Sequence, residues 1–293
     1  MPKVTVYITN HNYGSFLEQA IDSVLSQSFE DLELIVIDDG SEDNSREIIK
    51  KYKSNPKIKT IFQETKGLNA SNNVALKKAE GDFLLRLDAD DFLERYAVES
   101  MYELLNKNQE VAMVFPDYFN VNISGEIINR VFRHDFNKEV SLLDQPAHGA
   151  CTMIRKKVLE EVGGYDEEFD RQDGYDLWLK IIFKYRVMNL NEPLFYYRHH
   201  DRNLTKDLLE LFKTRASIKR KYIDYHKKGS VKSLAIIPFR GEKIDSSSKP
   251  LKKLSNRELL FWTVDQALLS KNVDKIIVSS PDRSSLDKVS KSY

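Results

Sequence analysis

The sequence predicts an α/β protein built on a mostly parallel β-sheet. Short apolar runs of strand length alternate with single helical segments of roughly 10 to 15 residues, which is the pattern of βαβ units. Two of these runs end in adjacent acids, at residues 38–39 and 88–91. After about residue 116 the pattern changes to that of a hairpin, which predicts a small antiparallel element beside the parallel strands.

The first part of the chain supplies the parallel strands. Residues 4–9 form the first strand, and Ser15 begins a helix whose apolar side chains recur at spacings of three and four. The same arrangement repeats up to about residue 115. Further strands are expected at 32–37, 58–62, 82–87 and 111–115, and helices at 45–52, 69–79 and 95–106.

The next segments predict the antiparallel element and then a return to helices. Residues 118–122 and 126–132 flank Ser124 and Gly125 as a hairpin. Strands are expected at 149–154 and 193–199, and helices at 156–162 and 175–185. We expect these elements to complete a first domain, residues 1–205.

Residues 206–229 predict a basic amphipathic helix and linker. Residues 206–228 carry eight basic and three acidic side chains, a balance of +5. Such a helix either packs on its own domain or links two domains, or it lies on an anionic membrane. A new pattern then begins, with strands at 233–238 and 275–279 around a helix at 258–270. Residues 230–293 therefore predict an incomplete second α/β unit.

The composition excludes several classes of protein. Lysine plus arginine and aspartate plus glutamate both number 45, so no net charge recruits nucleic acid, and no nucleic-acid partner is expected. The single cysteine, Cys151, cannot form an internal disulfide, which favours the cytoplasm. No apolar run approaches the ~18 residues of a membrane span. Peripheral contact with the inner face of a membrane stays open, and nothing indicates the oligomeric state.

The most informative stretch is residues 84–91, where an apolar strand ends in Asp88, Asp90 and Asp91. The carboxyl ends of parallel strands open onto the crevice where ligands bind. Three carboxylates there repel one another unless a cation neutralises them, and Mg²⁺ prefers carboxylates together with substrate phosphates. The alternative is that Asp88 or Asp90 caps the next helix and Asp91 is a solvated acid in its first turn.

Five blocks in order along the chain resemble family 2 glycosyltransferases of the GT-A fold. The resemblance covers about residues 1–205. The blocks are VTVYITNHNY at 4–13 with AIDSVLSQSF at 20–29 and LIVIDDGS at 34–41, GLNA at 67–70, RLDADD at 86–91, VGGYDEEF at 162–169, and QD at 172–173 before YDLWL at 175–179.

The resemblance implies a Rossmann-like GT-A fold and a nucleotide-diphospho-sugar donor. Its sugar is transferred, with inversion at the anomeric carbon, to a hydroxyl of a glycan or lipid-linked acceptor. Asp39 matches the acid that reads the base or ribose of the donor. The backbone of Thr9, Asn10 and Asn12 matches the opposite wall of the nucleotide site. The acceptor side is expected in residues 117–147.

The resemblance also implies a bound Mg²⁺ or Mn²⁺ and a catalytic base. Asp88 matches the acid near the ribose and the metal, and Asp90 the acid that ligates the ion directly. Asp173 matches the base that deprotonates the acceptor hydroxyl. A positioned base contributes 10²–10⁴-fold to such a transfer, and a bound divalent ion stabilises the leaving diphosphate. His199 or His200 is a further candidate for contact with the metal or the diphosphate, with a surface role as the alternative.

Three positions depart from the family pattern. Gln172 stands where an acid usually precedes the base, and Gly174 looks inserted after it. Asn72 stands where a basic residue is frequent, so one phosphate contact is expected to be missing. Asp173 also suits the N-cap of the helix at 175–185, a role compatible with catalysis.

The C-terminal residues carry a second resemblance. Residues 234–241, 249–251, 259–267 and 274–280 are similar to the first third of cytidylyltransferases that make CMP-activated acidic sugars. Arg240 and Lys243 or Lys249 match the cations that hold the nucleotide triphosphate. The Gly-Gly of that family is Gly241-Glu242 here, and the sequence reaches Tyr293 before that family's metal acids. The resemblance therefore implies a truncated domain, and nucleotidyl transfer is not expected.

These observations predict a metal-dependent, inverting glycosyltransferase of cell-surface polysaccharide synthesis. Two alternatives remain. One is a non-catalytic nucleotide-sugar-binding or scaffold protein with the same fold, and the other is a remnant of a bifunctional glycosyltransferase and cytidylyltransferase. A glycosidase also uses two carboxylates, but its chemistry does not call for an acid cluster of metal-binding type at a strand end.

Overall fold

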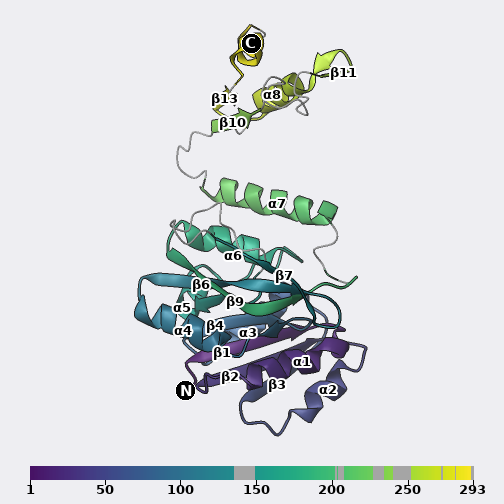
Figure 1. Ribbon diagram of the computed structural model, residues 1–293, viewed down its shortest axis with the longest axis vertical. Coiled ribbons are helices and arrows are strands. Elements are labelled where there is room, and N and C mark those ends of the chain that lie inside the picture. Colours follow the sequence, from purple (N-terminus) through teal and green to yellow (C-terminus); the bar gives the residue numbers. More distant parts are fainter. Residues whose placement is uncertain are drawn as a thin grey trace. The chain divides into compact units, whose positions relative to one another are not determined.

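The computed structural model in Figure 1 divides into two compact units, Met1–Arg220 and Lys221–Tyr293. It describes residues 1–134, 149–201, 203, 208–226, 234–239, 252–271, 273–280 and 282–291.

Four parallel strands form one half of the main sheet of the first unit. They lie in the order β3-β2-β1-β4, so the chain moves outward from β1 to β3 and then returns to the other side of β1. This reversal between β1 and β4 is a topological switch point, where ligands bind beyond the carboxyl ends of the strands. The strands are β1 (Val4–Asn10), β2 (Leu32–Asp39), β3 (Ile58–Gln63) and β4 (Phe83–Asp88).

The other half of the sheet contains the predicted antiparallel element. β8 (Met153–Arg155) pairs antiparallel with β4 and with β6 (Val111–Val121). β6 then runs parallel to β9 (Arg186–Arg198), and the short β5 (Phe92–Leu93) pairs with β9. The hairpin is confirmed, because β7 (Ile127–Val131) pairs antiparallel with the end of β6.

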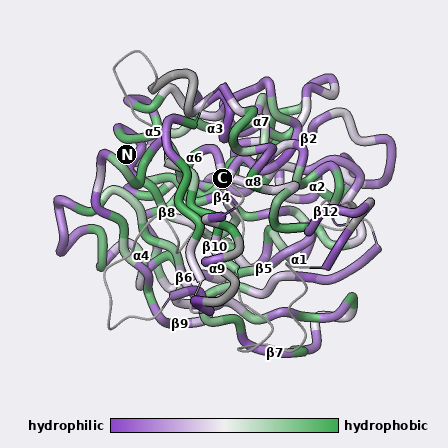
Figure 2. Tube along the Cα trace, turned by 90° about the horizontal axis from the view of Figure 1, so that it is seen from above, coloured by the Kyte–Doolittle hydropathy of each residue, from purple (hydrophilic) through white to green (hydrophobic). Residues whose placement is uncertain are grey.

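Helices cover both faces of the sheet (Figure 1). Side chains of α1 (Gly14–Leu25), α2 (Ser45–Lys51) and α4 (Ala97–Lys107) pack into one hydrophobic cluster. Those of α3 (Leu68–Lys78), α5 (Lys156–Glu161) and α6 (Asp173–Ile182) pack into a second cluster. Figure 2 shows the resulting alternation of hydrophobic and hydrophilic stretches along the chain. Because both faces are covered, β2 is buried at all eight positions.

The basic helix is present as α7 (Leu208–His226). Its Arg215 Nε donates a hydrogen bond to Gln172 Oε1 at 2.6 Å, and the guanidinium lies over the ring of Tyr175, 5.3 Å from the centroid. α7 therefore contacts the segment at the start of α6. Within the described residues, no helix has the length and apolar character needed to cross a membrane.

The second unit contains a small parallel sheet with two helices. The two predicted strands are present as β10 (Leu234–Pro238) and β13 (Lys275–Ser279), and they pair in parallel. α8 (Leu259–Leu269) and α9 (Arg283–Ser290) supply its small core, and β11 (Lys253–Leu254) and β12 (Arg257–Glu258) form a short ladder. The expected triphosphate cations Arg240, Lys243 and Lys249 lie outside the described residues.

The structure corrects three local predictions. Residues 149–152 are not a strand, since Cys151 has a φ of 49° and only Met153–Arg155 pairs with neighbours. α6 begins at Asp173, two residues before the expected start. No helix follows Asp91 directly, because Phe92–Leu93 is a strand and the next helix, α4, has Tyr96 at its N-cap. This arrangement contradicts the alternative in which the acids cap a helix.

Candidate active site

A crevice opens at the switch point between β1 and β4. Thr9 and Asp88 pair across these two strands in the parallel register. The crevice brings together residues from distant parts of the chain: Thr9, Tyr13, Leu68, Arg86, Asp88, Asp90, Gly149, Tyr197, Asn203 and residues 171–175. The predicted metal acids and the predicted base therefore lie in one cavity.

The acids at the end of β4 form a compact cluster. One carboxylate oxygen from each of Asp88, Asp90 and Asp91 lies within 4.8 Å of the other two. The backbone N–H of Asp91 donates to the carbonyl of Asp88 at 3.1 Å, which turns the chain back so that the three side chains converge. Oxygen ligands at this spacing suit a hard divalent cation.

The cluster is electrostatically strained without a cation. Burial raises the pKa of Asp88 to about 6, and the charges of Asp90 and Asp173 add to this rise while Arg86 opposes it. Burial and the charges of Asp90 and Asp88 raise the pKa of Asp91 well above its ordinary value. The Oδ2 atom of Asp91 is buried without a hydrogen-bond partner among the described residues. Such an oxygen is costly unless a cation or a proton satisfies it.

Arg198 at the end of β9 fixes the cluster from outside the motif. Its backbone N–H donates to Asp91 Oδ1 at 2.9 Å, and its Nε donates to the carbonyl of Asp90 at 2.8 Å. Its Nη2 donates to Gln19 Oε1 at 2.6 Å, so α1 is joined to the same network. Arg198 is not among the site residues predicted from the sequence. Its place directly before two histidines at a strand end is the signal that could have found it.

The histidine that contacts the acid cluster is His200. Its Nε2 lies 2.8 Å from Asp90 Oδ2, and its ring stacks on Phe16 at a centroid distance of 5.2 Å. The Nε2 of His199 instead lies 2.9 Å from Asn120 Oδ1, and its ring contacts Tyr197 edge-on. Of the two candidate histidines, His200 therefore contacts an acid of the cluster, and the metal contact predicted for His199 stays a prediction.

Arg86 lies between Asp173 and the acid cluster and contacts both. Asp173 is the first residue of α6, and its side chain forms an ion pair with the Arg86 guanidinium, so it makes no capping hydrogen bond. Arg86 Nε also lies 2.9 Å from Asp88 Oδ1. The Oδ1 atom of Asp173 accepts no hydrogen bond from any described residue, which leaves it available at the crevice.

The residues predicted for the nucleotide site do not all line this crevice. Thr9 lines the crevice, whereas Asn10, Asn12 and Asp39 are absent from its lining. Asn10 Nδ2 donates to Asp38 Oδ1 at 3.1 Å, and Asn12 Oδ1 accepts from the N–H of Glu42 at 2.8 Å. These contacts tie the end of β1 to the loop after β2.

Asp39 organises the loop that leads to α3. Its Oδ1 accepts from Gln63 Nε2 at 2.7 Å and from the Lys66 N–H at 2.9 Å, and its Oδ2 accepts from the Gly67 N–H at 2.8 Å. A separate shallow hollow lies beside this loop, lined by Gly40, Arg46, Phe62, Gln63, Glu64 and Thr65. Each carboxylate oxygen has two lone pairs, so Oδ2 keeps one acceptor position beyond Gly67.

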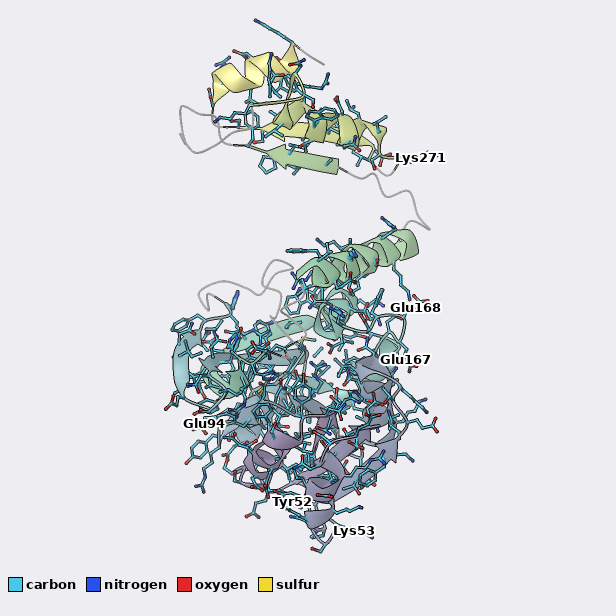
Figure 3. All side chains as sticks on the ribbon, turned by 90° about the vertical axis from the view of Figure 1, so that its right-hand side faces the viewer. Tyr52, Lys53, Glu94, Glu167, Glu168 and Lys271 are labelled. Atoms are coloured by element: carbon cyan, nitrogen blue, oxygen red, sulfur yellow. The ribbon has the colours of Figure 1, made fainter. Side chains whose placement is uncertain are left out.

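Helix α3 is joined to the turn before the base. Asn73 Nδ2 donates to the carbonyl of Tyr165 at 2.9 Å and to Glu167 Oε1 at 2.7 Å; Figure 3 labels Glu167. Asn69 Nδ2 reaches the carbonyls of Asp166 and Phe169, each at 2.7 Å. Asn72, between them, is fully buried and both side-chain polar atoms have no hydrogen-bond partner among the described residues.

Comparison with protein families identifies the first unit. Residues 5–163, more than half of the chain, match the family model for glycosyl transferase family 2. The chain belongs to glycosyl transferase family 2. Residues 234–292 match the family model for cytidylyltransferases, so both resemblances found in the sequence are confirmed.

Proteins similar to this chain include a much longer one. The chondroitin synthase of Pasteurella multocida (strain Pm70) is 30% identical to this chain over 193 residues, which are 64% of this chain. They are 20% of that synthase, so this chain spans about a fifth of the length of that relative.

Solved structures share the fold of this family 2 chain. The crystal structure of S. aureus TarS 1-349 in complex with UDP-GlcNAc has a TM-score of 0.62 at 22% identity, and the match covers 70% of this chain and 61% of that one. The mannosyltransferase PcManGT from Pyrobaculum calidifontis, in complex with GDP-Man and Mn²⁺, has a TM-score of 0.60 at 18% identity, over 78% and 65% of the two chains. The expected GT-A fold is therefore confirmed.

Proposed function

We propose that the first unit transfers a sugar from a nucleotide-diphospho-sugar to a hydroxyl of a glycan or lipid-linked acceptor, with inversion and with Mg²⁺ or Mn²⁺ bound. The observation that carries this proposal is the convergence of Asp88, Asp90 and Asp173 in one crevice at the switch point. Membership of family 2 supports the reaction class. The synthesis of a cell-surface polysaccharide is part of the proposal, supported by the similarity to a chondroitin synthase.

The acid cluster fits a divalent cation. Its oxygens are of the type that Mg²⁺ and Mn²⁺ prefer, and they lie within 4.8 Å of one another. Burial disfavours the charges of Asp88 and Asp91 unless a cation balances them. Asp88 and Asp90 would hold the ion, with His200 orienting Asp90. When bound, such an ion acts as a Lewis acid that stabilises the charge growing on the leaving diphosphate.

Asp173 is the proposed base. As the acceptor oxygen bonds to the anomeric carbon of the donor, its proton passes to Asp173 Oδ1. The bond between that carbon and the diphosphate oxygen breaks, and the nucleoside diphosphate leaves with the electron pair. Attack from the side opposite the leaving group inverts the configuration at that carbon.

The nucleotide role of Asp39 stays a prediction. Its chain neighbour Gly40 and its hydrogen-bond partner Gln63 both line the hollow beside the loop at 63–67, which is the place where we propose that the base or ribose binds. A membrane contact of the basic helix α7 and the identity of the acceptor also stay predictions.

A binding-only protein is the second candidate. Asn72 replaces the frequent cation of the family, and its buried amide makes no hydrogen bond with the described residues. A protein of this kind would bind a nucleotide-sugar without consuming it.

A donor screen tests both candidates. The full chain is incubated with UDP-, GDP- and CMP-sugars, with Mn²⁺ or with a chelator, and released nucleotide and thermal unfolding are both measured. The proposed function predicts nucleotide release with one donor class that the chelator abolishes. Stabilisation by a donor without release supports the binding-only protein; at 100 times the Kd, binding adds ~2.7 kcal/mol of stability. The control is Asp82→Asn, an exposed acid just before the opposite end of β4, which should behave as wild type.

A further inference from the structure

Arg86 is a charged side chain at a buried position of a central strand. It lies in β4 between Leu85 and Leu87, which are fully buried, and its own side chain is only 4% exposed. Burying a charge is expensive unless it is well paired, and an apolar residue at the same place would avoid that cost. The presence of arginine there calls for a compensating role.

The pairing of Arg86 joins the two halves of the proposed site. Residues 86 and 88 lie on the same face of β4 because side chains alternate along a strand. Arg86 Nε lies 2.9 Å from Asp88 Oδ1, and Nη1 pairs with Asp173 Oδ2. Burial alone would lower the pKa of Arg86, but the charges of Asp173 and Asp88 outweigh it and raise that pKa, so the guanidinium stays charged.

The surroundings leave the ion pair little freedom. A Cβ added to Gly149 would lie 2.7 Å from Asp173 Oδ2 and 3.3 Å from Arg86 Cζ, so a side chain there would require the ion pair to shift. On the same buried side, the hydroxyls of Tyr7 and Tyr165 are 2.7 Å apart. The guanidinium is a rigid fork, whereas lysine offers a single point charge that cannot hold two carboxylates in a fixed geometry.

We propose that Arg86 is a positioning residue that ties the base Asp173 to the cation-binding Asp88, so that acceptor activation and cation binding are coupled. This inference rests on the proposed function for the roles of the two acids. With Asp173 in place, the guanidinium is shared between two carboxylates. Without the charge of Asp173, it turns wholly to Asp88 and competes with the cation for that carboxylate.

The coupling can be measured without turnover. Mn²⁺ affinity is determined for wild type, Asp173→Asn, Arg86→Met and the double variant, on full-length protein whose folding is checked by circular dichroism. If Asp173 affects the cation only as a negative charge through space, D173N should reduce the Mn²⁺ affinity by the same factor in wild type and in R86M. The proposal predicts that D173N weakens Mn²⁺ binding by roughly 3- to 10-fold more when Arg86 is present, within the range usual for contacting residues. Equal losses in the two backgrounds would overturn it.

Kinetics separate positioning from a structural role. Arg86→Met should lower kcat on the order of 100-fold, since small displacements of a reacting group have that effect, with a change below about threefold in the donor KM. Arg86→Lys should have a higher kcat than Arg86→Met. If R86M does not fold, R86K takes its place in the Mn²⁺ affinity measurements. There the extra loss of affinity caused by D173N should be smaller than with Arg86. A donor KM that rises as much as kcat falls, with no recovery in R86K, counts against positioning.

Arg155→Met is the matched structural control. Arg155 pairs opposite the other end of β4 and donates to the carbonyls of Val111, Leu105 and Asn108, away from the crevice. It should lose thermal stability but keep kcat and Mn²⁺ affinity within about twofold of wild type. Wild type that binds neither Mn²⁺ nor any donor would overturn the proposed function itself, whereas wild type that binds both but gives an additive cycle overturns only the role of Arg86.

Discussion

Replacing Asp173 by asparagine tests the proposed base most directly. The substitution keeps the size of the side chain and removes the oxygen that would take the acceptor proton. General-base catalysis contributes 10²–10⁴-fold, so kcat should fall by that factor, equivalent to about 2.7–5.4 kcal/mol at 1.36 kcal/mol per factor of ten. At saturating Mn²⁺, donor binding should persist, since Asp39, Asp88 and Asp90 are all still present.

The same substitution has a calculable cost in stability. Asp173 and Arg86 are 6% and 4% exposed, and breaking a buried pair costs about 3–5 kcal/mol when it leaves an unpaired charge. Arg86 keeps its contact with Asp88, so we expect a smaller loss of about 1–3 kcal/mol. For a unit of this size that corresponds to a fall of roughly 2–12 °C in Tm.

The assay is nucleotide release from the donor that the screen identifies, with acceptor present, at a temperature where thermal scans show each variant folded. Asp170→Asn is the control. Asp170 lies three positions before the base, and its exposed carboxylate pairs only with Arg171 among the described residues. It should keep activity within about threefold. A folded D173N protein that retains activity within that same range would show that another group accepts the proton, and the reasoning about the crevice would be wrong.

Four further predictions concern the cation site and the space around the base. Asp90→Asn should weaken Mn²⁺ binding by at least 10-fold in a calorimetric titration, an effect of the size expected for a lost ligand contact, while Asp82→Asn leaves it unchanged. Mn²⁺ affinity should fall as the pH drops through about 6, the raised pKa of Asp88, because the proton and the cation compete for that carboxylate; an affinity constant down to pH 4.5 contradicts this. In the cation-free protein the sign is opposite: protonated Asp88 stabilises the fold fully below its unfolded pKa near 4, and this contribution is lost as the pH rises through about 6, which urea unfolding at several pH values measures. Gly149→Ala should lower kcat, since the added Cβ would press on Asp173 Oδ2, and it should leave the protein folded. An unchanged kcat would indicate that Asp173 and Arg86 can move aside.

The elements of the parallel half could be predicted because their signals are local. Apolar runs of strand length and helices with a three-and-four spacing reproduce β1 to β4 and the helices between them. The loop at 149–152 could not be predicted in this way. Its residues are small and apolar enough to look like a strand, yet Cys151 adopts a positive φ and its N–H donates to the carbonyl of Arg86 at 2.7 Å. That conformation depends on a partner more than sixty residues away.

The candidate site follows the same division. The acids at 88–91 could be recognised from the sequence, since they directly end an apolar strand. The partners that decide how they act come from remote segments: Arg198 and His200 from the end of β9, and Asp173 from the start of α6. Sequence spacing carries no information about these distances, so the finding that His200 is the histidine beside Asp90 had to come from the structure.

Asp39 matches the family's nucleotide-reading acid, and the contacts of its side chain are with the loop before α3. Its carboxylate accepts three hydrogen bonds from the loop at 63–67, directly before α3. Removing it would free two backbone N–H groups and one side-chain amide at that loop, at about 1–3 kcal/mol for each group left buried and unsatisfied. A loss of donor affinity in an Asp39 variant would therefore not by itself identify a nucleotide contact. A direct nucleotide contact is indicated only by an Asp39 variant that loses donor affinity while its free energy of unfolding is unchanged, because the loop at 63–67 then keeps its conformation.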